Sequence, residues 1–268
     1  TLIEKGSYRC VFLIAEICGF MVSIYKFNNV KQYNFAICSI ITLIKMNVLI
    51  VLAHPEPKSF NGALYWTAIK TLQQLGHTVK TSDLYAMEFK PSSNRHNFTT
   101  VKDDSFLKLG LEEIYASEND GFEIDIETEQ QKLEWCDLII WQFPLWWFSV
   151  PATLKGWTDR VFAAGKVYGA GRVPYVSGKF KGKKVLLSIT TGSPQEDFAK
   201  GGCHGDINGI LRPIHRGIFQ YTGFSVLQPN LNYAVAHISY QQRKKMLAQW
   251  SDRLKVVFQE EVLSVGHY

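Results

Sequence analysis

The sequence has few cysteines and no apolar run long enough to cross a membrane. Only five of its 268 residues are cysteine, three of them precede residue 46, and no C-x-x-C pair occurs. This usage excludes a disulfide framework and a zinc-finger pattern, and it favours the reducing cytoplasm. The apolar runs 11–25 and 35–44 are shorter than the roughly 18–20 residues of a spanning helix, so we expect no stable membrane insertion.

The sequence also lacks a strong excess of charge of one sign. It has 29 Lys and Arg against 24 Asp and Glu, a net charge of +5, and five basic and two acidic residues fall within residues 1–45. Nucleic-acid-binding proteins usually concentrate basic charge in their folded part, so we expect no nucleic-acid partner. The hydrophobic content of 46% excludes a disordered chain.

The character of the chain changes at Met46. Residues 1–45 match neither a secretory signal nor a transit peptide, because they lack an ordered basic and apolar arrangement and are not rich in Arg and Ser. We expect Met46 to be the natural start, residues 1–45 to be a leader outside the fold, and residues 46–268 to form one domain. An unusual targeting segment or a weakly membrane-associated arm is the alternative for the leader.

From Met46 on, short apolar runs alternate with helical stretches. The predicted strands are 47–53, 77–83, 137–142, 183–190 and 224–231. The predicted helices are 60–75, 126–135, 151–164, 204–221 and 239–261, with a polar insertion over 90–121. This alternation predicts an α/β fold with a five-stranded, doubly wound parallel sheet and helices on both faces. Ligands bind beyond the carboxyl ends of such strands.

Three loops at that edge have distinctive compositions. After the first strand, Ser59 is placed to cap a helix, whose first N–H groups attract anions, although neither G-x-G-x-x-G nor G-K-S/T is present. After the third strand, Trp146 and Trp147 stand between prolines and suit a wall for a flat ring system. After the fourth strand, the small residues 190–193 let backbone N–H groups approach a planar ligand. A plain capped helix and a hydrophobic plug remain open alternatives for the first two loops.

Longer stretches around these loops resemble the NAD(P)H:quinone oxidoreductases of the DT-diaphorase type. The matching segments are 51–54, 59–61, 82–87, 142–151, 154–157, 187–192 and 204–206. The resemblance extends from Met46 to about Glu261. It implies a flavodoxin-like fold, bound FAD, a homodimer with its sites at the subunit interface, and ping-pong reduction of quinones by NAD(P)H.

The resemblance also implies the residues that bind FAD. The first loop, with His54, Ser59, Phe60 and Asn61, matches the diphosphate and ribityl region. The second, with Leu145, Trp146, Trp147 and Phe148, matches the wall along the isoalloxazine. The third, with Thr190, Thr191, Gly192 and Ser193, matches its polar edge. The remaining cofactor positions are Phe198, near the flavin, and Arg243, near the adenosine end.

Catalytic and substrate positions follow from the same resemblance. Tyr168, Tyr221 and His237 match the substrate pocket, and Tyr168 reaches it across the subunit interface. His204 matches the histidine beside the flavin and is, with Tyr168, a predicted catalytic residue. Negative charge develops at the edge of a flavin that accepts a hydride, and a histidine supplies a donor or a cation there near neutral pH.

The sequence departs from the family pattern near this histidine. Phe198 replaces the tyrosine six residues before it, so a hydroxyl is lost and His204 is expected to act alone. Ser193 replaces the second glycine of its loop and is expected to crowd the nicotinamide side. Ala170 replaces a second tyrosine of the substrate pocket, which implies a roomier pocket.

Two other functions fit the same fold. One is an FMN-dependent, azoreductase-like flavoenzyme, and the other is a flavin-binding regulatory protein with weak catalysis. Arg243 and the 59–61 loop favour FAD over FMN. Cys203 stands beside His204 without a third partner in the sequence, so we interpret it as a small loop residue and not as a nucleophile. The cysteine pattern also leads us to expect no metal site.

Overall fold

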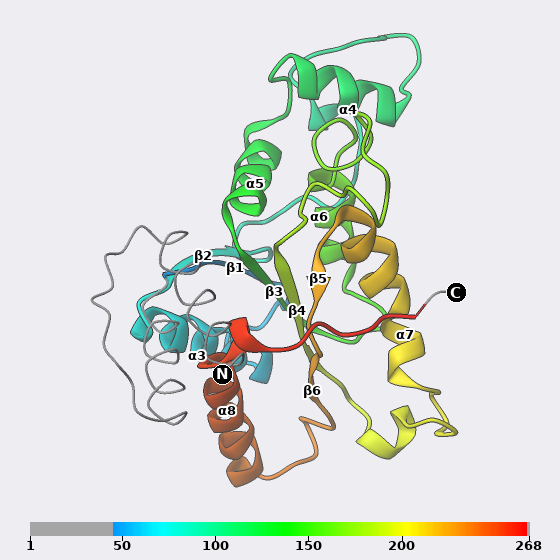
Figure 1. Cartoon of the computed structure of the whole chain (residues 1–268). Coiled ribbons are helices and arrows are strands. Elements are labelled where there is room, and N and C mark those ends of the chain that lie inside the picture. Colours follow the sequence, from blue (N-terminus) through cyan, green and yellow to red (C-terminus); the bar gives the residue numbers. More distant parts are fainter. Residues whose placement is uncertain (1–44, 267–268) are drawn as a thin grey trace, which may run out of the picture. The chain divides into compact units, whose positions relative to one another are not determined.

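A parallel sheet forms the centre of the computed structural model, which describes residues 45–266; the predicted leader lies outside the described residues except for Lys45. The strands are β1 (Asn47–Leu52), β2 (Thr78–Asp83), β3 (Leu138–Pro144), β4 (Lys184–Thr190), β5 (Ser225–Val226) and β6 (Asn230–Asn232). Their order is β2-β1-β3-β4-β5, with β6 also paired to β4, and every pairing is parallel (Figure 1). The predicted parallel sheet is confirmed.

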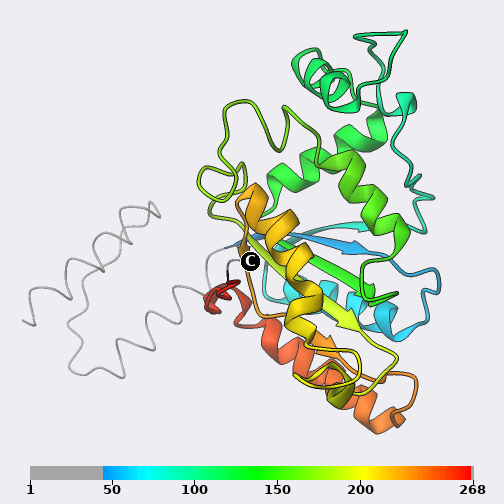
Figure 2. The same cartoon turned by 90° about the vertical axis from the view of Figure 1, so that its right-hand side faces the viewer.

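Helices cover both faces of this sheet (Figures 1 and 2). One face packs against α3 (Phe60–Gln74) and α8 (Tyr240–Leu254). The other packs against α5 (Ile124–Trp135), α6 (Ala152–Val161) and α7 (Ile207–Ile214). Successive side chains of a strand point to opposite faces, so a strand covered on both faces is mostly apolar. All seven residues of β3 are buried, which explains why all of them except Gln142 are apolar.

The fifth predicted strand, 224–231, is divided into two pieces. β5 pairs with Lys184 and Val185 at the start of β4, and β6 pairs with the last three residues of β4. Pro229, between the two pieces, has no N–H group to donate to the ladder. The chain therefore leaves the sheet briefly and rejoins it beside the carboxyl end of β4.

The polar segment 90–121, predicted as an insertion, contains the helix α4 (Leu109–Glu118). Its buried residues include Glu112 and Glu113. Glu112 accepts two backbone N–H groups of the preceding loop at 2.8 and 2.9 Å, and Glu113 accepts that of Ala164 at 2.7 Å. Because paired carboxylates form part of the buried face, the hydropathy pattern does not reveal this helix.

The predicted helix 204–221 starts later than expected and changes pitch. α7 begins at Ile207 with Asp206 as its N-cap, and a wider π-helical turn, His215–Gln220, follows. Pro213 removes one backbone donor just before this change. The late start leaves His204 in the loop before the helix.

The remaining elements are short helical turns and a helix cap. Two 3-10 turns, Arg95–Asn97 and Gln195–Phe198, lie in loops, and a third, Val257–Gln259, follows α8. Ser239 and Gln242 form a capping box that fixes the start of α8. Among residues 45–266, no helix has the length and apolar character needed to span a membrane.

The π-helical turn buries an unusual histidine. His215 is 2% exposed, and its Nε2 atom has no hydrogen-bond partner among the described residues. Desolvation lowers the pKa of His215 from 6.5 to about 4. The unfolded chain therefore binds more protons than the folded one between these values, and stability present above about pH 6.5 is lost as the pH falls toward 4.

We expect His215→Phe to remove much of this sensitivity to acid. Between about pH 7.5 and about pH 5, the buried histidine lowers the stability of the wild type by about 2 kcal/mol through proton linkage, whereas phenylalanine does not titrate. Denaturant unfolding at both pH values measures the difference, with the exposed His96→Gln as the control. An equal loss in wild type and His215→Phe would contradict the prediction.

Candidate active site

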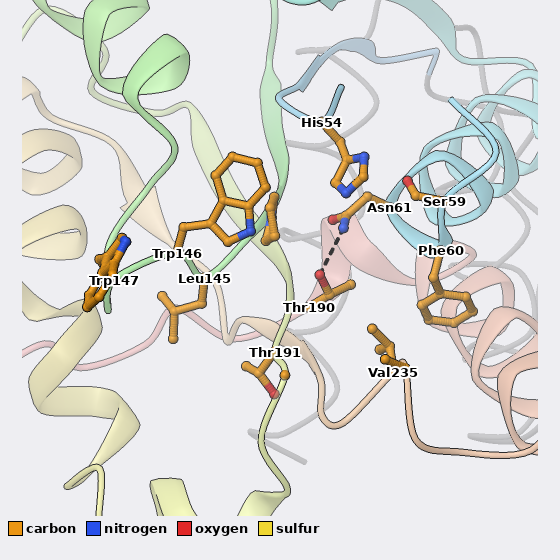
Figure 3. Close-up of a pocket in the computed structure, with 13 residues that line it drawn as sticks. His54, Ser59, Phe60, Asn61, Leu145, Trp146, Trp147, Thr190, Thr191 and Val235 are labelled. Carbon is orange, nitrogen blue, oxygen red and sulfur yellow. Dashed lines mark hydrogen bonds between the residues drawn. The ribbon is translucent and has the colours of Figure 1, made fainter. Parts of the chain in front are cut away.

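A cleft of about 430 Å³ opens at the carboxyl edge of the sheet (Figure 3). It lies where the strand order reverses, because the chain passes from β1 to β2 on one side and from β3 to β4 on the other. Loops diverge at such a point and leave a crevice beyond the strand ends. The loops after β1, β3 and β4 line the cleft, as does the segment after β6.

Most of the predicted cofactor residues meet at this cleft. Those that line it are His54, Ser59, Phe60, Asn61, Leu145, Trp146, Trp147, Thr190, Thr191 and Gly192. Sequence reasoning missed Pro144, Val235 and Ala236, which also line it. The last two are small apolar residues, and their only sequence signal was their place beyond the carboxyl end of the last strand.

Hydrogen bonds between three buried polar side chains connect the elements around the cleft. Gln142 Nε2 donates to Asn61 Oδ1 at 2.8 Å. Asn61 Nδ2 donates to Thr190 Oγ1 at 2.8 Å (Figure 3). The three side chains come from β3, the start of α3 and the end of β4, and each residue is at most 3% exposed. Asn61 therefore fixes the relative positions of the first and third loops.

The loop after β1 folds back on the start of α3. Ser59 Oγ accepts the Gly62 N–H at 3.1 Å, which caps the helix. A side chain on Gly62 would collide with the carbonyl group of Pro57, so this approach requires glycine. His54 Nδ1 accepts the Glu56 N–H at 3.0 Å, which orients its ring at the cleft. The predicted cap is confirmed, with the helix start facing the cleft.

The aromatic loop after β3 is a tight turn. Trp146 and Ser149 exchange backbone hydrogen bonds of 3.1 and 3.0 Å, and the two residues between them have φ of 49° for Trp147 and 58° for Phe148. Large side chains rarely adopt this left-handed conformation, which costs energy and clusters at functional sites. Trp147 is 95% exposed. The turn thus holds aromatic rings outward, next to the cleft.

His204 lies beside this turn. Its ring centroid is 5.3 Å from that of Phe148 and 5.0 Å from that of Phe198. Its Nε2 atom lies 2.9 Å from Ser193 Oγ. The Ser193 hydroxyl, expected to crowd the nicotinamide side, is thus paired with the histidine. His204, expected to act alone because Phe198 lacks a hydroxyl, has a hydroxyl partner from another position.

Two predicted substrate residues lie at the opposite end of the sheet. Tyr168 belongs to the connection from α6 to β4, and Tyr221 precedes β5, so both approach the amino ends of the strands. Their ring centroids are 6.3 Å apart. Burial, and then the charge of Glu113, raise the pKa of Tyr168 to about 12, so its hydroxyl stays protonated. Neither tyrosine lines the cleft of its own chain.

Arg243, predicted near the adenosine end, supports the segment after β6. Its Nη1 atom donates to the carbonyl of Val235 at 3.1 Å and to that of Ile238 at 2.7 Å. Val235 and Ala236 line the cleft, so Arg243 acts on the cleft through this segment. His237, a predicted substrate residue, is exposed in the same segment.

The comparisons with known proteins place this chain in a family. A model of the flavodoxin-like fold matches residues 46–254. Ribosyldihydronicotinamide dehydrogenase (quinone) of Mus musculus is 44% identical over 217 residues, 80% of this chain and 93% of the relative. NAD(P)H dehydrogenase (quinone) 1 of Rattus norvegicus is 44% identical over 216 residues, 80% of this chain and 78% of the relative. The chain belongs to the NAD(P)H:quinone oxidoreductase family.

Solved structures agree with membership of the quinone oxidoreductase family. A protein of Klebsiella pneumoniae assigned as a quinone reductase is 40% identical, with a TM-score of 0.79, and covers 81% of this chain and 87% of its own. General stress protein 14 of Treponema denticola, solved with FMN, is 23% identical with a TM-score of 0.52 and shares the fold alone. The resemblance found in the sequence is thus confirmed at the level of the family.

We expect Asn61→Ala to destabilise the protein by about 2 kcal/mol, because it leaves the buried Gln142 amide and Thr190 hydroxyl without their shared partner. The exposed Gln73→Ala, on the same helix, is the control and should change stability by less than about 0.5 kcal/mol. Denaturant unfolding measures both. Equal stabilities of the two variants would show that these hydrogen bonds do not hold the loops.

Proposed function

We propose that the protein is an FAD-dependent quinone reductase, which takes two electrons from NAD(P)H and passes them to a quinone in a ping-pong reaction. The observation that carries the proposal is the cleft at the β1/β3 reversal, where most of the predicted flavin-binding residues converge. Family membership supports it, since relatives 44% identical to the chain are named quinone dehydrogenases.

The residues around the cleft fit a flavin. A flavin needs an apolar surface for its ring faces, hydrogen-bonding groups for its ring edge and an anion site for its phosphates. Leu145 and the neighbouring tryptophans offer the apolar surface, and the 190–192 loop offers hydrogen-bonding groups. The capped start of α3 offers the anion site. When bound, the flavin supplies the acceptor and donor of two electrons, while the protein positions it and adjusts its electrostatic surroundings.

Two features support FAD over FMN. The first loop contains Pro55 and Pro57 rather than the cluster of Ser, Thr and Gly that binds the phosphate in flavodoxins. Arg243 braces the segment after β6, at the predicted adenosine end. An FMN-dependent, azoreductase-like enzyme is the second candidate, because FMN-bound neighbours share the fold.

His204 is the residue that we assign to charge stabilisation. Its ring is held between Phe148 and Phe198, and Ser193 Oγ lies 2.9 Å from its Nε2 atom. This arrangement keeps an imidazole nitrogen beside a hydroxyl group at the end of the polar loop. A donor or cation fixed in advance stabilises developing negative charge more effectively than one that must reorient.

A homodimer completes the proposed site. Tyr168 and Tyr221 are predicted substrate residues, yet they lie at the sheet edge opposite the cleft of their own chain. Only a second chain of this protein can bring the two tyrosines to a cleft, as in the homodimer that the family resemblance implies. The 95% exposed Trp147 at the cleft also suits coverage by a second chain. A sedimentation mass of one chain at assay concentration would contradict the dimer.

The proposal is tested on the purified full chain. Flavin is released and identified by chromatography, and reduction of a simple benzoquinone is followed with NADH, NADPH or ribosyldihydronicotinamide. We expect one FAD per chain and turnover faster than free FAD supports. Release of FMN would favour the azoreductase-like alternative, and bound FAD without faster turnover would favour a regulatory protein. Either outcome overturns the proposal of an FAD-dependent quinone reductase.

We expect His204→Gln to slow reduction of the bound flavin by at least about tenfold, a barrier change of about 1.4 kcal/mol. Ser193→Gly removes only the hydroxyl partner and should have a smaller effect. Stopped-flow bleaching of the flavin under anaerobic conditions measures both, with the distant His96→Gln as the control. Wild-type rates for His204→Gln at full flavin occupancy would remove His204 from the mechanism.

A further inference from the structure

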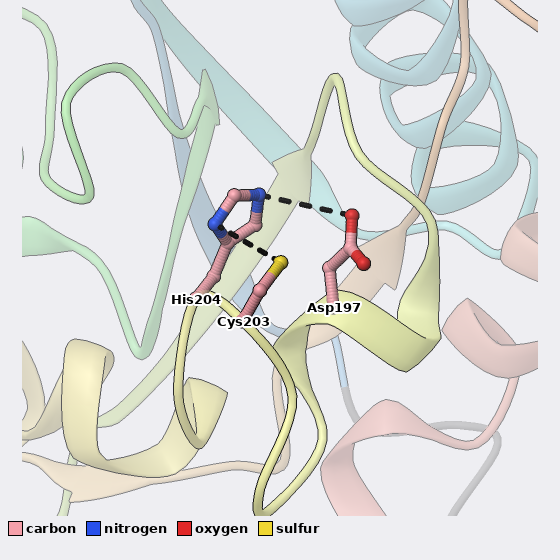
Figure 4. Close-up of side chains that lie close together, drawn as sticks. All are labelled: Asp197, Cys203 and His204. Atoms are coloured by element: carbon pink, nitrogen blue, oxygen red, sulfur yellow. Dashed lines mark hydrogen bonds and ion pairs between the residues drawn. The ribbon is translucent and has the colours of Figure 1, made fainter.

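Three potential metal ligands of different chemistry meet beside the cleft (Figure 4). Asp197, Cys203 and His204 each offer one ligand atom, and these atoms lie within 4.8 Å of one another. Cys203 is exposed, whereas Asp197 and His204 are half-buried. The sequence predicted no metal site, and it offered no third partner for Cys203 and His204. The fold of the loop provides one six residues before Cys203.

The distances within this cluster suit a small divalent cation. Zinc bonds of about 2.0–2.3 Å place the ligands of a tetrahedral site roughly 3.3–3.8 Å apart. Cys203 Sγ lies 3.7 Å from His204 Nδ1, and Asp197 Oδ2 lies 3.8 Å from His204 Nε2. The two distances involve different ring nitrogens, so rotation of the exposed Cys203 side chain is needed to bring all three donors onto one ion.

The backbone holds the three residues together without a metal. His204 N–H donates to the Asp197 carbonyl at 2.9 Å, and Gly202 N–H donates to the Ala199 carbonyl at 2.8 Å. A side chain on Gly202 would collide with the carbonyl group of Asp197, so the turn is too tight for any other residue. Binding an ion here therefore requires little ordering of the chain.

We propose that Asp197, Cys203 and His204 bind a zinc-like divalent cation. Thiolate, imidazole and carboxylate are the donors that zinc accepts, and harder ions such as magnesium avoid sulfur. As the ion binds, the Cys203 thiol releases its proton to solvent and the sulfur forms the metal bond. The cluster supplies three protein ligands, and water completes the site on the exposed side.

Binding of an ion at this site has a consequence for the neighbouring cleft. This consequence rests on the proposed function. The ion takes a nitrogen of His204, and the imidazole then cannot respond freely to charge that develops at the cleft. Zinc is thus expected to inhibit quinone reduction, and Cys203→Ser to raise the zinc concentration for half-inhibition about tenfold.

The binding test does not depend on turnover. The full chain is alkylated with iodoacetamide at increasing zinc chloride concentrations, and the Cys203 peptide is quantified by mass spectrometry. We expect zinc to protect Cys203, and Asp197→Asn and His204→Gln each to raise the half-protecting concentration about tenfold or more. Glu196→Gln is the matched control, since it removes one exposed carboxylate from the same turn and should leave protection unchanged.

The outcomes separate binding from function. Undiminished protection in both Asp197→Asn and His204→Gln would mean that zinc binds a lone thiol, which overturns the site. Absence of protection at millimolar zinc overturns it as well. A protein without reductase activity that still shows ligand-dependent protection keeps the site and rejects only the proposed function.

Discussion

A parallel sheet buried on both faces is the constraint on which this molecule depends. Every residue of β3 is buried, including Gln142 at its carboxyl end. A buried amide without partners costs about 1–3 kcal/mol, so polar groups are tolerated in such strands only where neighbouring loops can satisfy them. Asn61 meets that need and also bonds to Thr190. The polar group of β3 is thereby placed near the end of the strand where the cleft forms.

The fold could be predicted where one physical effect dominates. Strands covered on both faces are mostly apolar, so β1, β3 and β4 stand out in the sequence. The helix α4 does not stand out in the sequence, because its buried face contains glutamates. Their carboxylates accept hydrogen bonds from backbone N–H groups outside the helix. The break between β5 and β6 and the late start of α7 depend on tertiary pairing and on a cap, which local patterns do not specify.

The site could be predicted in its loops and only partly in its contacts. Residues beyond the carboxyl ends of parallel strands have to converge, so the sequence alone predicts that His54, Trp146 and Thr191 lie at one cleft. The pairing of Ser193 with His204 could not be foreseen, because it depends on the path of a loop. The meeting of Asp197 with Cys203 depends on the same loop, whose tight turn at Gly202 has no hydropathy signal.

The left-handed turn after β3 has a consequence for how this protein would respond to selection. Trp147 and Phe148 adopt positive φ, a conformation in which glycine or asparagine is more stable. Selection for heat resistance alone would therefore favour smaller residues at both positions. The exposed aromatic rings persist at an energetic disadvantage, so a thermostable variant obtained without selection for activity would be expected to lose them first.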